Sequence, residues 1–229
     1  MAKILMTAIV ADIRNKLNGS VFSKNRYGAY VRTKVTPVNP QTTAQQNVRA
    51  RLATNAQAWR GLTEAQRQSW IDAAPLFPFT DIFGNSKTLS GSTLYVKLNN
   101  NLAGLLIPAL ANAPAPVAIP QLEIYGLTAT AAVQSLSFSF LTAPVPAGLF
   151  MVIQTTGNVT PGKSFVKNLY RTVFAYPAAT TQPQALIAPF TIKHGATVAG
   201  QKIFMRAFYI STITGQAGIP VQAMVIVAP

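Results

Sequence analysis

A proline- and alanine-rich stretch at residues 107–120 divides this sequence into two parts with different apolar periodicity. Its four prolines, at 108, 114, 116 and 120, interrupt helices and central strands, so the stretch predicts an extended, semi-rigid linker. Apolar residues recur every three or four positions before it and alternate after it, which are the periods of helices and strands. We therefore expect an α+β, multidomain chain with a basic arm and β-hairpin (1–38), a helical domain (39–106), the linker (107–120) and a β-sandwich (121–229).

The part after the linker predicts seven short strands. They fall near residues 122–127, 132–141, 148–156, 165–176, 185–192, 201–211 and 219–228, with 214–218 as the last hairpin loop. Alternation is clearest through Leu136, Phe138 and Phe140. This pattern is typical of a two-sheet, immunoglobulin-like (Ig-like) sandwich. Because cysteine is absent, we expect the fibronectin type III kind, which needs no disulfide.

The part before the linker predicts three helices. Asn39 as N-cap with Pro40 in the first turn indicates the start of the first, and Gly61 indicates its end. Its apolar stripe consists of Ala44, Val48, Leu52, Ala56 and Trp59. Thr63 to Gln66 forms a capping box for a second helix that ends at Pro75. We expect the two helices to form a hairpin in which Trp70, Ile71 and Ala74 face Trp59, so that Trp59 and Trp70 are structural core.

A third helix is expected after a loop or short hairpin that turns at Gly84–Asn85. Ser90 or Ser92 would cap this helix, and Leu94, Tyr95, Leu98 and Leu102 would be its buried side. Three consecutive asparagines, 99–101, either carry polar contacts or fray its end.

The stretch 19–40 interleaves basic and aromatic residues and contains no carboxylate. Residues 20–24 and 30–35 predict an antiparallel hairpin that turns through 25–28, where Gly28 is free to adopt a positive φ. An isolated hairpin is marginal in water, so this one should dock on another surface. We expect the partner-binding residues to be Phe22, Lys24, Arg26, Tyr27, Tyr30, Arg32 and Lys34. A solvated basic loop is the alternative.

Charge is concentrated at the N-terminal end. The whole chain carries a formal charge of +14, and residues 1–70 hold eleven basic and two acidic side chains. This region therefore suits an acidic protein surface or a polyanion, for which Arg49 and Arg51 are further candidate contacts. No unbroken apolar run of membrane-spanning length occurs, so we expect no membrane partner.

Catalytic and metal-site patterns are sparse. Residues 157–164 (GNVTPGKS) match the phosphate-binding G-x-x-x-x-G-K-[ST] motif, but no Asp or Glu follows Glu123 to hold Mg²⁺. We interpret the motif as a turn between strands. The single histidine, His194, has no thiol partner and no acidic residue near it in sequence, so we expect a solvent-facing loop residue. We predict no enzyme activity, no cofactor and no metal.

Several motifs resemble a known module. Residues 21–32 (VFSKNRYGAYVR), 36–42 (TPVNPQT), 59–67 (WRGLTEAQR) and Trp70 resemble a module in uncharacterised structural proteins of tailed bacteriophages. The likeness covers about residues 13–105. Residues 200–204 (GQKIF) and 214–218 (TGQAG) resemble the Ig-like or fibronectin-like domains that such virion proteins append. The resemblance implies a virion component made in the bacterial cytoplasm and implies no catalytic residue.

These observations lead to a hypothesis with two alternatives. We expect a non-enzymatic virion protein, oligomeric in the assembly and associated with the head as a capsid auxiliary or decoration protein. Its basic N-terminal module would dock on neighbouring subunits. A neck, tail or baseplate protein is one alternative, and a nucleic-acid-binding virion protein that contacts the packaged genome is the other.

Overall fold

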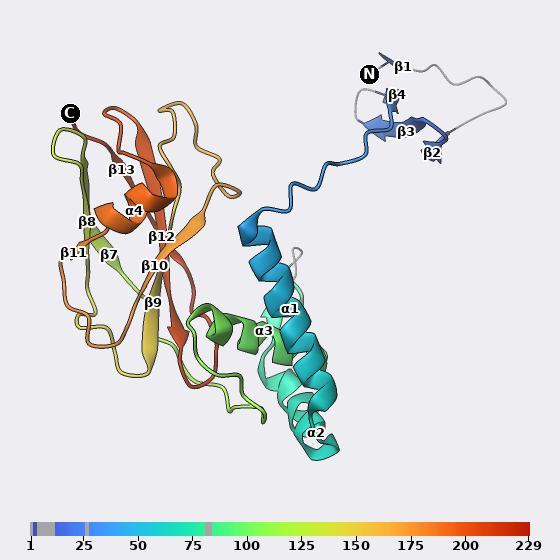
Figure 1. Ribbon diagram of the computed structural model, residues 1–229, viewed down its shortest axis with the longest axis horizontal. Coiled ribbons are helices and arrows are strands. Elements are labelled where there is room, and N and C mark those ends of the chain that lie inside the picture. The colour runs from blue at the N-terminus through green and yellow to red at the C-terminus, as the bar shows by residue number, and fades with distance from the viewer. Residues whose placement is uncertain (1, 4–11, 26–27, 81–83) are drawn as a thin grey trace. The chain divides into compact units, whose positions relative to one another are not determined.

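The structure is a computed structural model that describes residues 2–3, 12–25, 28–80 and 84–229. It is a mixed α+β fold with helices and antiparallel sheets, as expected. The chain separates into two compact units, Met1–Gln46 and Asn47–Pro229. Their elements are labelled in Figure 1.

The first unit is an antiparallel sheet with the strand order β1-β4-β3-β2. The strands are β1 (Ala2–Lys3), β2 (Asn15–Leu17), β3 (Ser20–Asn25) and β4 (Gly28–Thr33). The predicted hairpin is present as β3 and β4, and Gly28 has a φ of 111°. The sequence did not indicate β1 and β2, which extend the hairpin on both sides.

The first helix begins later than predicted. α1 covers Thr43–Gly61, and Thr42 and Gln45 form a reciprocal capping box at its start. The side chain of Asn39 instead accepts from the backbone N–H of Gln41, which has a φ of 47°. The chain therefore turns after Asn39–Pro40, and the helix starts at the next capping signal.

The helical part of the second unit is built on α3. Its elements after α1 are α2 (Glu64–Ala73), the 3₁₀ turn η1 (Ala74–Leu76), the short hairpin β5 (Phe79–Thr80) and β6 (Ser86–Lys87), and α3 (Gly91–Gly104). The Thr63 capping box and the Ser90 cap are both present. The predicted buried residues of α3, Leu94, Tyr95, Leu98 and Leu102, are all buried.

The predicted pairing of the two tryptophans is wrong in detail. Trp70 is fully buried and packs edge-on against Tyr95 of α3, with ring centroids 5.1 Å apart, and Trp59 packs on the same ring at 5.4 Å. Tyr95 thus stands where the two tryptophans were expected to meet. Ile71 is 48% exposed because the buried side of α2 faces α3, whereas Ala74 is buried as predicted.

The stretch 107–120 has no regular secondary structure, and several of its groups are bonded to the rest of the unit. The Asn99 side chain bonds both backbone groups of Leu110, and Trp70 Nε1 donates to the Ala111 carbonyl at 2.9 Å. Further along, the Val117 N–H donates to the side chain of Gln216. The stretch is therefore held by hydrogen bonds to the helices and to the loop at 212–220. Of the two alternatives for the asparagines 99–101, Asn99 carries polar contacts.

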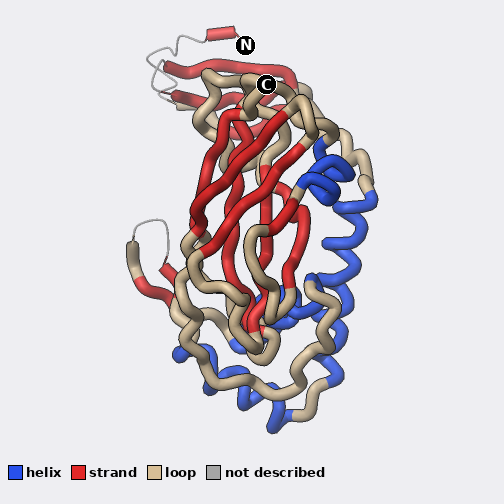
Figure 2. The backbone as a smooth tube through the Cα atoms, turned by 90° about the vertical axis from the view of Figure 1, so that its left-hand side faces the viewer, coloured by secondary structure: helices blue, strands red, loops and turns tan. Residues whose placement is uncertain are grey.

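Two antiparallel sheets enclose the core of residues 121–229. One sheet has the order β10-β9-β12-β13 and the other β11-β8-β7. The strands are β7 (Ile124–Thr130), β8 (Ser135–Phe140), β9 (Leu149–Thr155), β10 (Arg171–Tyr176), β11 (Gln184–Ala185), β12 (Lys202–Ser211) and β13 (Val221–Ile226). These strands lie broadly along one common axis (Figure 2). Inward residues of both sheets, including Phe138, Met151 and Met205, form one cluster.

Two predicted strands differ in the structure. Residues 185–192 were expected as a strand, but only Gln184–Ala185 pair with β8, and Ile187–His194 form the helix α4. Leu186 and Phe190 are both fully buried while Ala188 between them is exposed, which a helical turn explains and strand alternation does not. Pro189 lies in the first turn, where its missing N–H has no partner to lose. In the expected strand 165–176, pairing starts only at Arg171.

Candidate protein-docking surfaces

The register of the N-terminal sheet sorts the predicted contact residues onto two faces. Residues directly opposite each other in an antiparallel pair project from the same side. Tyr30 and Arg32 therefore lie on one face, opposite Ser23 and Val21, and Lys16 of β2 joins them there. Lys16 was missed because β2 carries no strand pattern in the sequence.

The other face brings Phe22 together with Val31, while Lys24 lies opposite Ala29. Leu17 of β2 projects from this side and is 69% exposed. Lys34 follows β4 and its backbone N–H donates to the Gly19 carbonyl at 2.8 Å. Arg26 and Tyr27 lie outside the described residues. The described residues of the predicted set are thus divided, with Phe22 and Lys24 on one face and Tyr30 and Arg32 on the other.

None of the described residues 12–46 is buried. The apolar side chains Val21, Phe22 and Val31 are partly buried, and none of them is fully enclosed. By contrast, the second unit has two clusters of buried side chains. The described residues of the N-terminal sheet therefore form hydrogen-bonded strands with no buried core among them.

The charge of this sheet is barely compensated. Among its described residues, the ion pair is Arg14 with Asp12, at 2.7 Å. Lys16, Lys24, Arg32 and Lys34 are exposed and pair with no described carboxylate. These four cations can therefore meet an acidic surface without first breaking an ion pair to a described carboxylate.

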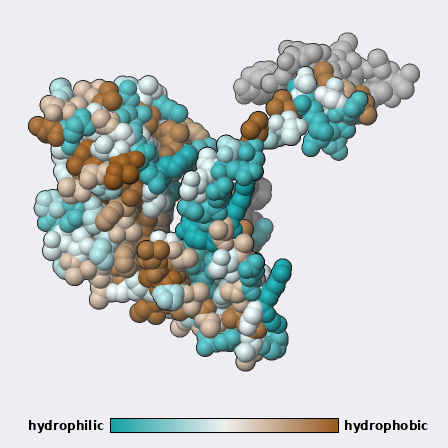
Figure 3. Space-filling view, in the orientation of Figure 1, coloured by the Kyte–Doolittle hydropathy of each residue, from teal (hydrophilic) through white to brown (hydrophobic). Residues whose placement is uncertain are grey.

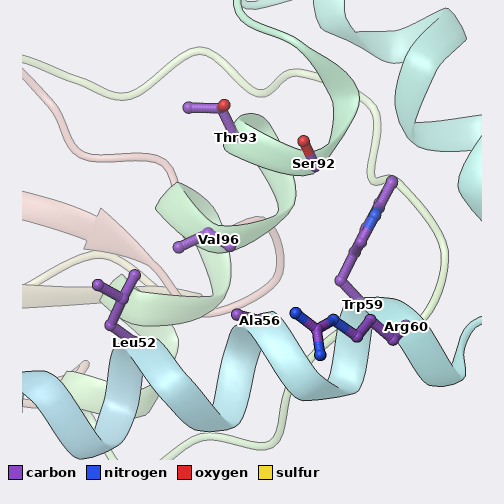
Figure 4. Close-up of a pocket in the computed structure, with 7 residues that line it drawn as sticks. All are labelled: Leu52, Ala56, Trp59, Arg60, Ser92, Thr93 and Val96. Carbon is purple, nitrogen blue, oxygen red and sulfur yellow. The ribbon is translucent and has the colours of Figure 1, made fainter.

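A second surface is the groove between α1 and α3 (Figure 4). Leu52, Ala56 and Trp59 of the predicted stripe line it. Val48 and Leu52 are 52% and 55% exposed instead of buried. The groove has a volume of about 500 Å³, and its walls are Leu52, Ala56, Trp59, Arg60, Ser92, Thr93 and Val96. The buried residue of α1 is Asn55, which lies outside the predicted apolar stripe.

The two candidate polyanion contacts on α1 have different surroundings. Arg49 is exposed. The half-buried Arg51 guanidinium lies against Gly104, at the C-terminal end of α3. A cation at this position is favoured by the partial negative charge of the last helical carbonyls. Arg51 therefore has a structural role at this helix end.

The loop that carries the phosphate-binding motif is built as a turn. The Lys163 N–H donates to the Thr160 carbonyl at 3.0 Å, and Val159 exchanges two backbone hydrogen bonds with Lys202. Residues 161–170 continue as turns and irregular loop to β10, so no helix N-terminus follows Lys163 and Ser164 to face a phosphate.

His194 is not a solvent-facing loop residue. It is the last residue of α4 and is half buried, with its ring 5.1 Å from that of Phe190. Burial lowers the pKa of His194, the charges of Arg171 and Lys193 lower it further, and a backbone hydrogen bond with Thr155 offsets part of this. The ring therefore stays neutral to lower pH than an exposed histidine.

No metal-site geometry appears in the part of the chain that the structure describes, since no three His, Asp or Glu side chains gather there. None of the described helices is long and apolar enough to cross a membrane. No protein-family model, curated protein or solved structure matches this chain. Its function must therefore be argued from its own surfaces.

Proposed function

We propose that this chain is a non-enzymatic structural protein of a tailed-bacteriophage virion. It associates with the head as an auxiliary or decoration protein and docks on neighbouring subunits through its N-terminal sheet. The observation that carries the proposal is that none of the described residues 12–46 is buried, although Phe22, Val31 and Tyr30 lie on this sheet. A sheet without its own core gains stability when a partner covers one of its faces.

Docking uses both faces and the edges of the sheet. A partner strand adds to the exposed edge at β2, and main-chain hydrogen bonds then set the register. One face buries Phe22 and Val31, and the other presents Tyr30 and Arg32 to an acidic surface. Each contact is small, and repetition of the docking site in an assembly raises the total affinity.

The C-terminal domain is the projecting or gap-filling part of the protein. Its first, second and fifth strands form one sheet, and its third, fourth, sixth and seventh form the other. This division supports the fibronectin type III arrangement, and it needs no disulfide. Such sandwiches host many functions, so the domain supports a structural role only together with the N-terminal sheet.

The test is to quantify this chain in particles of the virus that encodes it. Gradient-purified particles are digested and the ratio of the chain to the major head protein is measured by mass spectrometry. We expect the same ratio in every preparation of wild-type particles. In particles made with the Phe22→Ser, Arg32→Glu double variant, the ratio should fall strongly. The proposal is wrong if the chain is made during infection and is absent from purified particles.

A neck, tail or baseplate position uses the same docking surfaces, and copy number separates it from a head position. Head auxiliary proteins follow the many copies of the shell subunit, whereas neck and baseplate proteins follow a single ring. The mass-spectrometric ratio therefore decides between the two.

The nucleic-acid alternative rests on the exposed cations Lys24, Arg32 and Lys34. Fluorescent 30-mers, single- and double-stranded, are titrated with the full chain from low to physiological salt, alongside a variant with Lys24, Arg26, Arg32 and Lys34 all changed to Ala. Tight binding that persists at physiological salt and is lost in the variant would favour genome contact. Weak binding that vanishes with modest salt in both proteins supports protein docking.

A further inference from the structure

The α1–α3 groove is an apolar surface that the rest of the unit leaves uncovered. Leu52, Ala56 and Trp59 rise from α1 towards α3, where Val96 stands opposite (Figure 4). The side of α1 that faces the viewer in Figure 3 is mainly hydrophilic, so α1 is amphipathic. The apolar residues of α1 that line the groove run from Leu52 to Trp59, over about 10 Å or two helical turns. The groove therefore has the size and spacing that suit one partner helix.

The charge of α1 limits what fills this groove. The helix contains Arg49, Arg51 and Arg60 and no acidic residue. Arg60 forms part of the groove wall and pairs with no described carboxylate. α3 has no acidic residue either. A second basic helix would bring like charges together, whereas an acidic one would gain attraction along the rim.

The chain itself does not supply an acidic helix. Residues 1–42 contain seven basic side chains and a single acidic one, Asp12, so the N-terminal arm is a poor match. α2 carries Glu64 and Asp72, but its apolar side is buried against α3. In a second copy, α1 would meet the same three arginines. The occupant must therefore come from a different protein.

We infer that the α1–α3 groove binds an acidic amphipathic helix of another protein, with apolar side chains between Leu52 and Val96 and a carboxylate at Arg60. The inference does not depend on the virion proposal, because it concerns a surface of the second unit alone. It gives the protein two separate docking surfaces, a basic sheet and a basic-rimmed apolar groove.

The probe is a pair of synthetic peptides of about 15 residues, long enough for helix formation. Both carry leucines spaced i, i+4 and i+7 on an alanine background, one with glutamates on its flanks and its twin with lysines. The emission of Trp59 reports binding, because Trp70 is fully buried and its indole N–H is bonded. The variant Trp59→Phe, which keeps Trp70, shows that the signal comes from the groove.

The glutamate peptide should bind the full chain about tenfold more tightly than the lysine peptide at low salt, and the ratio should shrink as salt rises. Leu52→Ser should weaken binding about tenfold and Arg60→Glu about fivefold. The matched controls are Leu76→Ser, at a leucine 59% exposed, and Lys97→Glu. Both lie on a separate hollow of about 320 Å³ and should leave binding unchanged.

Three outcomes would overturn the inference. Equal binding of the two peptides would show that charge does not select the occupant, and absence of binding would show that the groove takes no helix. Sedimentation equilibrium supplies the third outcome, a dimer of the full chain that Leu52→Ser dissolves and Leu76→Ser does not. In that case the occupant is a second copy of this chain.

Discussion

The two units of this protein carry apolar side chains in opposite ways. In Asn47–Pro229, residues such as Phe138, Trp70 and Leu98 are almost completely enclosed. In the N-terminal sheet, Phe22 and Val31 occupy well-paired strands and remain only partly buried. Backbone hydrogen bonds alone add little net stability, so burial decides which unit persists by itself. The second unit is therefore a stable scaffold, whereas the N-terminal sheet gains buried apolar contacts when a partner covers it.

The largest expected effect comes from the sandwich core. Phe138→Ala removes a ring with no exposed surface that packs against Phe140 and Tyr176, and should cost about 3–5 kcal/mol. The matched change Phe22→Ala should lower the free energy of unfolding by less, about 1 kcal/mol, in the isolated chain, because this side chain is only partly buried. Urea denaturation followed by circular dichroism measures both. Similar losses in the free energy of unfolding for the two variants would show that the two units do not differ in this way.

Two glycines with positive φ sharpen the comparison. A Cβ at Gly215 would clash with the backbone oxygen of Leu98, so Gly215→Ala should lower the free energy of unfolding by about 2–3 kcal/mol, or the Tm by roughly 4–12 °C. Gly28 also has positive φ but has nothing within 4 Å of the added Cβ. Gly28→Ala strains only the N-terminal sheet and should leave the main thermal transition unchanged. A shift of that transition would show that the sheet contributes to the stability of the second unit.

A smaller effect tests the hydrogen bonds that hold the stretch 107–120. Asn99 is fully buried and bonds both backbone groups of Leu110, so Asn99→Ala leaves these groups unpaired and should cost about 1–3 kcal/mol. Asn100→Ala is the control at the neighbouring, half-buried position. Hydrogen exchange at residues 108–113 should accelerate in the first variant only. Equal exchange rates in the two variants would mean that the stretch 107–120 is held by other contacts.

The smallest effect is the pH dependence that His194 confers. Its folded-state pKa is lowered by burial, so the unfolded chain binds the proton more readily as pH falls below about 6.5. Stability should therefore decrease between pH 7.5 and pH 5.5, and His194→Gln should flatten this slope. The chain has one histidine, so no other histidine titrates in this window. If stability depended on pH as steeply in His194→Gln as in the unchanged chain, His194 would not be the group responsible.

Local signals predicted those elements that depend on neighbouring residues. The Thr63 capping box, the Ser90 cap and the alternation through Phe138 all appear where expected, because each is decided within a few residues. The start of α1 was misplaced because Asn39–Pro40 and Thr42–Gln45 are both valid start signals. α4 was missed because short apolar runs fit a strand or a helix equally well.

The candidate surfaces were less predictable for a different reason. Amphipathicity identifies the apolar side of α1, but whether that side is covered depends on how α3 and Tyr95 are placed. Asn99 shows the same limit, since its partner Leu110 lies in a stretch that the sequence marks only as proline-rich. The basic hairpin was predictable from its composition. Its division into two faces required the register.

Hydrogen exchange of the full chain in isolation tests the central claim most directly. If the described residues of the N-terminal sheet form no buried core, the amides of β3 and β4 should exchange at least about 100-fold faster than those of β9 and β12. Slow exchange of β3 and β4 in the isolated chain, comparable to that of β9 and β12, would contradict the claim. The N-terminal sheet would then be a stable unit, and its exposed faces would no longer argue for completion by a partner.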